Sequence, residues 1–216
     1  HINVNVSDRA LYEIYLPAFK ASVEDAKVWS VMGAYNQFRG QHCCHNDLLL
    51  NKILKQDWKF DGVVVTDWGG AHDTRQAALN GLDIEMGSYT NGLTSEAEFG
   101  YNDYFLADPF LALLRKGELP VSVVDEKARR ILRLIFRTAM NAERPFGRYV
   151  CADHSATALR VAEEGIVLLK NRHNLLPVQP GKYKRIAVIG ENATKNLTEG
   201  GGSSELKVKY QVSPLE

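Results

Sequence analysis

The spacing of apolar residues alternates between helical repeats and short β-branched runs over the first 86 positions. From Leu11 to Val23 the apolar residues recur at helical intervals, whereas Phe60 and 63–65 form the continuous run typical of a strand buried on both faces. The same pattern predicts helices at 7–27, 46–58 and 72–80 and strands at 29–35, 60–65 and 82–86. Such alternation of strands and helices indicates a parallel α/β architecture.

The pattern changes after residue 86. Residues 87–109 are rich in Gly, Ser, Asn and Asp, so we expect a long surface loop there. A helix is predicted from Ser122, which together with Asp125 would form a start like a capping box. We expect its apolar stripe to face the core, and this stripe comprises Val124, Ala128, Ile131, Leu132, Ile135 and Phe136.

An irregular segment separates this helix from the rest of the chain. Residues 141–149 contain Pro145 and Gly147 and predict an interdomain linker. A helix at 155–170 and a strand at 185–189 follow, which indicates the start of a second α/β domain. We therefore divide the chain into a first domain at 1–140, a linker at 141–153 and the beginning of a second domain at 154–216.

Composition and charge exclude several classes of partner. With 45% apolar residues among 216, the chain can bury a core. Lys and Arg together number 26, as do Asp and Glu, and no basic block is present, so we expect neither nucleic acid nor a membrane surface as partner. No apolar run approaches the roughly 20 residues that span a bilayer.

The predicted strands end in reactive and aromatic residues. Working residues of parallel α/β folds lie at the carboxyl ends of strands, and these strands end at 35–36, 67–68 and 85–86. Asp67 is the strongest candidate, because Gly69 and Gly70 let the backbone turn away from its carboxylate. Carboxylates beside aromatic rings suit a sugar pocket. The pattern leaves open that Asp67 only caps the next helix or pairs with an arginine.

Three other motifs give weaker indications of a functional site. Asp83 and Glu85 lie on the third predicted strand and are expected to make ordinary ion pairs. The contiguous run at 42–45, His-Cys-Cys-His, cannot easily surround one ion, so we expect no metal site. The strand at 186–190 resembles the start of a dinucleotide fold, but Glu191 interrupts the glycine pattern and nucleotide binding is not expected.

Several motifs in order resemble the family 3 glycoside hydrolases, in particular their β-glucosidase and β-xylosidase branches. The first three are Ser-Val-Met-Gly-Ala-Tyr-Asn at 30–36, Gly-Val-Val-Val-Thr-Asp-Trp at 62–68 and Gly-Leu-Asp-Ile-Glu-Met at 81–86. The resemblance continues through 163–171, 175–177, 186–190 and the glycine-rich loop at 200–203. It covers nearly the whole chain.

The resemblance implies a fold and a set of site residues. The family has a (β/α)8-like TIM barrel followed by an α/β sandwich, so residues 1–140 would be the C-terminal part of the barrel and 154–216 the start of the sandwich. By this resemblance Asp67 is the nucleophile, Tyr35 and Trp68 line the sugar pocket, Met32 borders it, and Ser203 or its neighbour approaches from the second domain. The family requires no cofactor and no metal.

The sequence departs from the family pattern because several of the family's segments are not in it. A complete barrel of this kind needs about 250 residues. The family's upstream Lys-His motif is absent, and its acid/base glutamate would lie beyond Glu216. We therefore expect an internal fragment of a larger enzyme.

The implied activity is that of a retaining exo-acting β-glycosidase, which hydrolyses terminal non-reducing β-linked sugars through a covalent glycosyl-enzyme on Asp67. The expected partner is a carbohydrate, a β-glucoside or a β-xyloside, and the resemblance favours a periplasmic or secreted enzyme. The alternatives are a β-xylosidase of the same family and a truncated fragment that does not catalyse.

Overall fold

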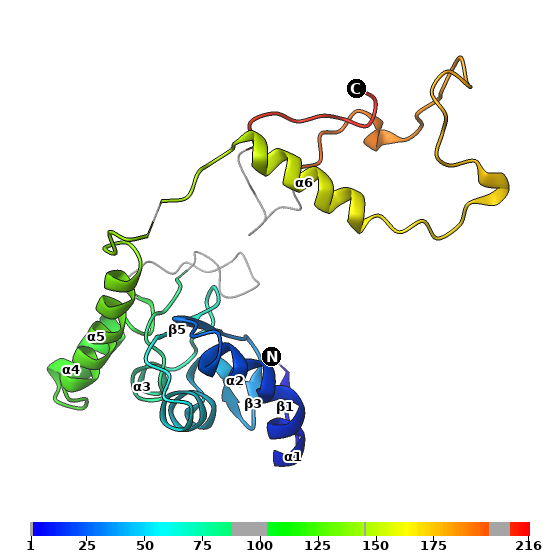
Figure 1. Ribbon diagram of the computed structural model, residues 1–216. Coiled ribbons are helices and arrows are strands. Elements are labelled where there is room, and N and C mark those ends of the chain that lie inside the picture. The colour runs from blue at the N-terminus through cyan, green and yellow to red at the C-terminus, as the bar shows by residue number, and fades with distance from the viewer. Residues whose placement is uncertain (1, 88–102, 145, 199–207) are drawn as a thin grey trace. The chain divides into compact units, whose positions relative to one another are not determined.

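The computed structural model describes residues 2–87, 103–144, 146–198 and 208–216 (Figure 1). The chain divides into two compact units, His1–Arg144 and Pro145–Glu216, and each is described by itself. The assignment of residues 1–140, 141–153 and 154–216 to a barrel part, a linker and a sandwich part stays a prediction.

The centre of the first unit is a parallel strand pair. Strand β2, Ser30–Gly33, pairs with β5, Val63–Thr66, and Val65 forms a further parallel bridge to Ile84. Strand β2 lies inside its predicted range of 29–35, whereas β5 starts three residues later and ends one residue later than the predicted 60–65. The mixed α/β character is confirmed. The predicted strand at 82–86 is reduced to that single bridge, because the Met86 N–H donates to the Thr66 side chain and not to a strand backbone.

A second, smaller sheet lies at the start of the chain. Strand β1, Asn3–Val4, runs parallel to β3, Gln37–Phe38, and β3 pairs antiparallel with β4, Gln41–His42. The pattern of apolar residues did not predict this sheet, because each strand has two residues and too few positions to show a period.

The predicted helix at 7–27 forms one helical stretch, made of α1 (Asp8–Ala10), the π-helical η1 (Leu11–Tyr15) and α2 (Leu16–Glu24). Ser7 caps it, since its Oγ accepts from the Ala10 N–H at 3.2 Å. Pro17 lies in the first turn of α2, directly after the wider π turns, where its missing N–H interrupts the ladder least.

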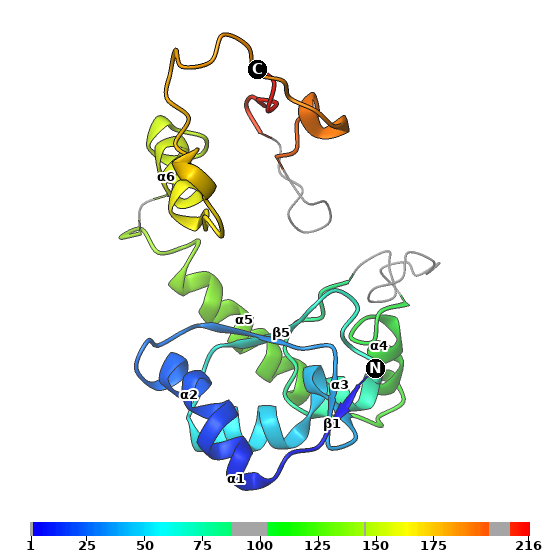
Figure 2. The same ribbon diagram turned by 90° about the vertical axis from the view of Figure 1, so that its right-hand side faces the viewer.

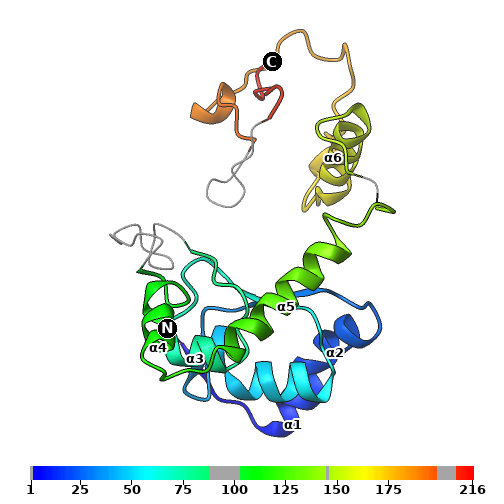
Figure 3. The ribbon, with the colours of Figure 1, turned by 90° about the vertical axis from the view of Figure 1, so that its left-hand side faces the viewer.

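Further helical segments among the described residues of the first unit are η2 (Cys43–His45), η3 (Leu48–Asp57), α3 (Thr74–Leu79), α4 (Asp108–Arg115) and α5 (Ser122–Arg137). The predicted cap of η3 is confirmed, because Asn46 Oδ1 accepts from the Leu49 N–H at 3.0 Å. Helix α4 begins inside the segment predicted to be a loop at 87–109, most of which lies outside the described residues. Figure 2 shows α5 next to β5, and Figure 3 shows α5 from the opposite side.

The apolar stripe predicted for α5 is not its buried face, since Ile131 is half-buried and the other five stripe residues are exposed. The stripe residues Val124, Leu132, Ile135 and Phe136 are exposed, as is Ala128, while Lys127 is buried. The Lys127 ammonium donates to the Ala77 and Leu82 carbonyls, and Arg130 donates to the carbonyls of residues 60 and 62. The polar face turns inward because these carbonyls need donors. The predicted capping box is also wrong, since no side chain caps α5.

The core of the first unit packs around β5. Val63 and Val64 are almost completely buried, and the cluster around Val64 joins residues from η3, α2 and the segment after α3. Its buried members are Val23, Leu50, Leu54, Phe60, Val64, Ala71, Ala77 and Leu82. This packing holds β5, and therefore the residue that follows it, in one position.

Gly62, just before β5, has no room for a side chain. A Cβ there would lie 2.3 Å from the Trp29 carbonyl oxygen and 2.6 Å from the Phe60 ring. Gly62→Ala is therefore expected to destabilise the fold by about 1–3 kcal/mol, the usual range for overpacking. Urea unfolding measures this, with Gly147→Ala as the matched control, because nothing lies within 4 Å of that position. Equal stability of the two variants would contradict the prediction.

The described residues of the second unit form α6 (Ala152–Gly165) and the short 3-10 turns η5 (Arg172–Asn174) and η6 (Glu191–Ala193). The predicted helix at 155–170 is confirmed up to residue 165. The predicted strand at 185–189 is wrong: it is irregular, and Ile189 is 91% exposed. A strand forms only beside another strand that satisfies its backbone, and the described part of this unit contains none.

None of the helices within the described ranges is long and apolar enough to cross a membrane.

Candidate active site

Asp67 stands at the carboxyl end of β5. Thr66, the last residue of the strand, is fully buried, and its N–H donates to the Ile84 carbonyl at 3.0 Å while its hydroxyl accepts from the Met86 N–H at 2.8 Å. The strand end is therefore held on both sides. The Asp67 side chain is half-buried, and its Oδ1 accepts from the Trp68 N–H at 2.7 Å.

The chain leaves β5 through a tight turn that depends on glycine. The Gly70 N–H donates to the Asp67 carbonyl at 3.0 Å, and Gly69 has a φ of +63°. A Cβ on Gly70 would lie 2.8 Å from Cys44 Sγ. Glycine at both positions allows the backbone to turn beneath the strand and leaves the Asp67 carboxylate at its tip.

Tyr35 reaches the same carboxylate from the neighbouring strand. It follows β2 by two residues, and because β2 and β5 are parallel their carboxyl ends lie at the same edge. Burial, a hydrogen bond to the Asp67 carboxylate and the charge of that carboxylate raise the pKa of Tyr35 to about 12. The phenol therefore stays protonated and donates a hydrogen bond to the carboxylate.

The two structural roles considered for Asp67 are taken by other residues. Asp73 caps α3, with its carboxylate accepting from the Gln76 N–H at 2.7 Å. The ion pairs found between described residues do not include Asp67. This carboxylate is thus held by a phenol and a backbone N–H without a cationic partner in the described ranges.

For the other candidate residues the structure shows no side-chain contact with the Asp67 carboxylate among the described residues. Trp68 follows Asp67 and is 45% exposed, so its ring is accessible. Met32 in β2 is 58% exposed and lines an apolar cavity of about 200 Å³ between β2 and helices α2 and η3. Ser203 lies outside the described residues. The structure therefore brings Tyr35 and Asp67 together and leaves Met32 on a neighbouring surface.

The two carboxylates of the third strand have different partners. Asp83 is buried and forms an ion pair with Lys55 Nζ at 2.8 Å, which confirms the ion pair predicted for it. Glu85 accepts from the backbone N–H groups of Phe105 and Leu106 at 3.2 and 2.6 Å, and the ion pairs between described residues do not include it. Burial raises the pKa of Glu85.

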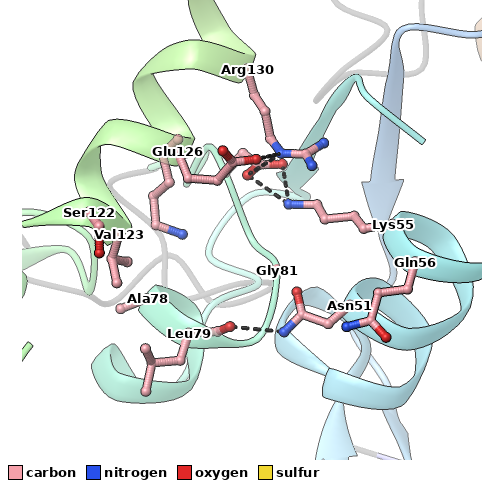
Figure 4. A pocket seen from close by; sticks show the side chains of 12 residues that line it. Asn51, Lys55, Gln56, Ala78, Leu79, Gly81, Ser122, Val123, Glu126 and Arg130 are labelled. Carbon is pink, nitrogen blue, oxygen red and sulfur yellow. Dashed lines mark hydrogen bonds and ion pairs between the residues drawn. The ribbon is translucent and has the colours of Figure 1, made fainter. Parts of the chain in front are cut away.

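A buried charged cluster lies at the opposite end of β5. Lys55 and Arg130 converge on Asp83, whose Oδ2 also accepts from the Val64 N–H at 2.8 Å. Figure 4 shows Lys55 reaching from η3 and Arg130 and Glu126 from α5 into a cavity of about 420 Å³. The charges are paired across these elements, so the cluster joins α5 to β5 and is separate from Asp67.

Three histidines lie close to the Asp67 turn, and the sequence did not indicate their proximity. The rings of His42 and His72 are stacked at 3.9 Å between centroids, and those of His42 and His45 lie 5.5 Å apart. Within the described ranges no group of three or more His, Cys, Asp or Glu side chains is arranged to hold a metal ion. Only the motif at 42–45 could have pointed to this cluster, and it does not contain His72.

Comparison with known proteins identifies two family domains in the chain. The family model described as glycosyl hydrolase family 3 N terminal domain matches residues 1–134, and that of the family's C-terminal domain matches residues 166–216. A β-glucosidase of Bacteroides ovatus is 62% identical, over 100% of this chain and 30% of its own length. An exo-α-(1→6)-L-arabinopyranosidase of Bifidobacterium longum is 35% identical, over 100% of this chain and 27% of its own length.

Solved structures give the same result. β-Glucosidase 3B from Thermotoga neapolitana, in complex with α-D-glucose, is 30% identical with a TM-score of 0.74 and covers 98% of this chain, which in turn covers 28% of that structure. The β-glucosidase from Kluyveromyces marxianus in complex with glucose is 33% identical with a TM-score of 0.73, over 98% of this chain and 25% of that structure. The chain thus spans less than a third of the length of the relatives it matches.

Proposed function

The chain belongs to glycosyl hydrolase family 3, and from this premise we propose that it is part of a retaining exo-acting β-glycosidase in which Asp67 is the nucleophile. The observation that carries the proposal is the carboxylate at the tip of the buried strand β5, oriented by the Tyr35 hydroxyl and the Trp68 N–H. Because the chain spans less than a third of its relatives, we propose that further chain completes the site.

The proposed reaction has two steps. In the first, an Asp67 oxygen bonds to the anomeric carbon while the glycosidic C–O bond breaks, and an acid/base glutamate beyond Glu216 protonates the leaving oxygen. In the second, that glutamate takes a proton from water, whose oxygen displaces Asp67 from the sugar. Tyr35 keeps its proton throughout, because its pKa lies near 12, and orients the carboxylate.

The proposed substrate is a terminal β-linked sugar. The relatives from Bacteroides ovatus and Kluyveromyces marxianus are named β-glucosidases, which supports a β-glucoside for this chain. The exposed ring of Trp68 suits the apolar C–H face of a pyranose. We assign Met32 to the border of this pocket and Ser203 to the contribution of the second unit. Residues 1–140 would then be the C-terminal part of a (β/α)8 barrel, and 154–216 the start of an α/β sandwich.

Stereochemistry tests this proposal. An enzyme of family length that contains these residues is incubated with an aryl β-glucoside and an aryl β-xyloside, and proton NMR follows the sugar first released. We expect the β anomer, since two displacements restore the configuration, and faster release from the glucoside. First release of the α anomer would contradict the role of Asp67, and preference for the xyloside would select the alternative substrate.

The isolated residues 1–216 are proposed to be inactive. The apolar cavity beside Met32 and the exposed side chain of Phe19 leave core-like surface without a cover in this part of the chain. Incomplete barrels expose strand edges and associate. The same aryl glucoside assay on these residues alone measures this, and turnover by them would contradict it.

A further inference from the structure

The three histidines contact the chain segments that carry Tyr35 and Asp67. His42 lies at the end of β4, His45 ends the short 3-10 turn η2 (Cys43–His45), and His72 follows the turn after Asp67. Cys44, between the first two of these histidines, lies next to Gly70 in the chain that leaves β5.

His42 holds the backbone of Tyr35. Its Nδ1 lies 3.2 Å from the Tyr35 carbonyl oxygen, and its Nε2 lies 3.1 Å from the Gln37 amide nitrogen. An amide nitrogen only donates, so Nε2 accepts and Nδ1 carries the proton that it donates to the carbonyl. This assignment, made from the hydrogen-bond partners, gives a neutral imidazole.

His45 holds the other side of the site in the same way. Its Nε2 accepts from the backbone N–H of His72 at 3.2 Å, and its Nδ1 lies 3.2 Å from Gln76 Oε1. The imidazole is 2% exposed and again carries its proton on Nδ1. A second proton, on Nε2, would face the His72 N–H and remove this bond.

The loop that carries these histidines cannot shift without moving the site. Cys44 is fully buried, and its Sγ occupies the space where a Cβ on Gly33 or Gly70 would lie, 2.7 and 2.8 Å away. The thiol donates to the Ala34 carbonyl at 3.4 Å. The loop is thus packed against the ends of both strands, one leading to Tyr35 and the other to Asp67.

We propose that His42 and His45 are positioning residues for the glycosidase reaction: as neutral imidazoles they fix the Tyr35 backbone and the turn from Asp67 to His72, and so align phenol and carboxylate. This inference rests on the proposed function. It adds residues that do not touch the substrate and a condition, the neutral state, under which they work.

The surroundings favour that neutral state. Burial lowers the pKa of His45, and a positive charge on His42 would lower it further by repulsion, while Gln76 and the Asp73 carboxylate oppose this effect. Burial, with His42 and His45 nearby, lowers the pKa of His72 to about 4. The other titratable groups facing this region are the Cys44 thiol, Tyr35 and Asp67. His45 and His72 are therefore protonated only at acidic pH, and there the bond from the His72 N–H to His45 is lost.

Variants of His45 in the full-length enzyme test the proposal. His45→Ala is expected to lower kcat by about 10- to 100-fold with little change in KM, because misplaced groups reduce the rate more than binding. His45→Gln keeps an acceptor for the His72 N–H and is expected to restore kcat to within about 3-fold. Since glutamine does not titrate, the acid limb of its kcat/KM profile should be less steep than in the unmodified enzyme.

The control and the contrary outcomes are defined by the same assays. His154→Gln, at an exposed position of α6, should leave kcat and the pH profile unchanged. Full activity of His45→Ala would overturn the proposal, as would a folded but inactive His45→Gln or an acid limb that stays unchanged in it. If His45→Ala does not fold, the glutamine variant decides. An unmodified enzyme without glycosidase activity would instead refute the proposed function.

Discussion

Asp67→Asn, in an enzyme of family length, is expected to lower the turnover of an aryl β-glucoside by about 10⁴-fold, the scale of losing a group that bonds to the substrate. The amide has no negative charge and cannot form the glycosyl ester in the first step. Its oxygen can still accept from the Trp68 N–H and the Tyr35 hydroxyl, so the geometry of the turn is retained. Initial rates with the purified variant measure the loss.

The fold should tolerate this substitution. In the described ranges Asp67 has no cationic partner that would be left buried and unpaired. The free energy of unfolding is therefore expected to stay within a few tenths of a kcal/mol of that of the unmodified protein. Asp61→Asn is the matched control for activity, because Asp61 pairs with Arg137 at 2.7 Å near the opposite end of β5. Normal turnover by Asp67→Asn would refute its role as nucleophile.

Asp83→Asn has the largest expected effect on stability, a loss of about 3–5 kcal/mol. Asp83 is 4% exposed and is the carboxylate that faces both Lys55, at 2.8 Å, and Arg130, at 4.0 Å. The amide oxygen can still accept from the Val64 N–H, so the variant removes the charge and keeps the shape. Lys55 then loses its carboxylate partner, and Arg130 keeps only Glu126, at 2.8 Å. Urea unfolding at pH 7 measures the cost.

The neighbouring lysine makes this cost larger. Burial lowers the pKa of Lys127 to about 8, with Asp83 opposing that effect, and Lys55 and Arg130 adding to it. Removing the charge of Asp83 leaves the cations of this cluster with less compensation, so the loss is greater than for one isolated pair.

A surface pair provides the control for this variant. Asp57 lies 3.1 Å from Lys52, and both side chains are largely exposed. Asp57→Asn should cost at most about 1 kcal/mol, because water screens such pairs. A loss for Asp83→Asn no greater than for this control would show that the buried cluster does not stabilise the fold.

The spacing of apolar residues predicted the structure correctly where the stabilising interactions are local or apolar. The β-branched run at 63–65 predicted a buried strand, and Val63 and Val64 are almost completely buried. The helical repeat starting at Ser7 predicted a helix, including its cap. Because a strand of known end must place the next residue at its tip, the position of Asp67 could be predicted as well.

The spacing of apolar residues gave wrong predictions where a partner distant in sequence determines the buried face or the secondary structure. The buried face of α5 was assigned to its apolar stripe, but Lys127 and Arg130 are directed inward by carbonyls 45 to 70 residues away. The apolar run at 186–189 does not become a strand, because strand formation requires a neighbour that this part of the unit does not contain.

The alternation of elements and the location of the candidate carboxylate were therefore determined by the sequence alone, since both follow from the spacing of neighbouring residues. Only the tertiary structure decided that Tyr35 meets Asp67 and that His42, His45 and His72 gather behind them. Hydrogen bonds such as that between His72 and His45 join residues 27 positions apart. Such contacts depend on how strands and loops pack together, and no periodicity along the chain records that packing.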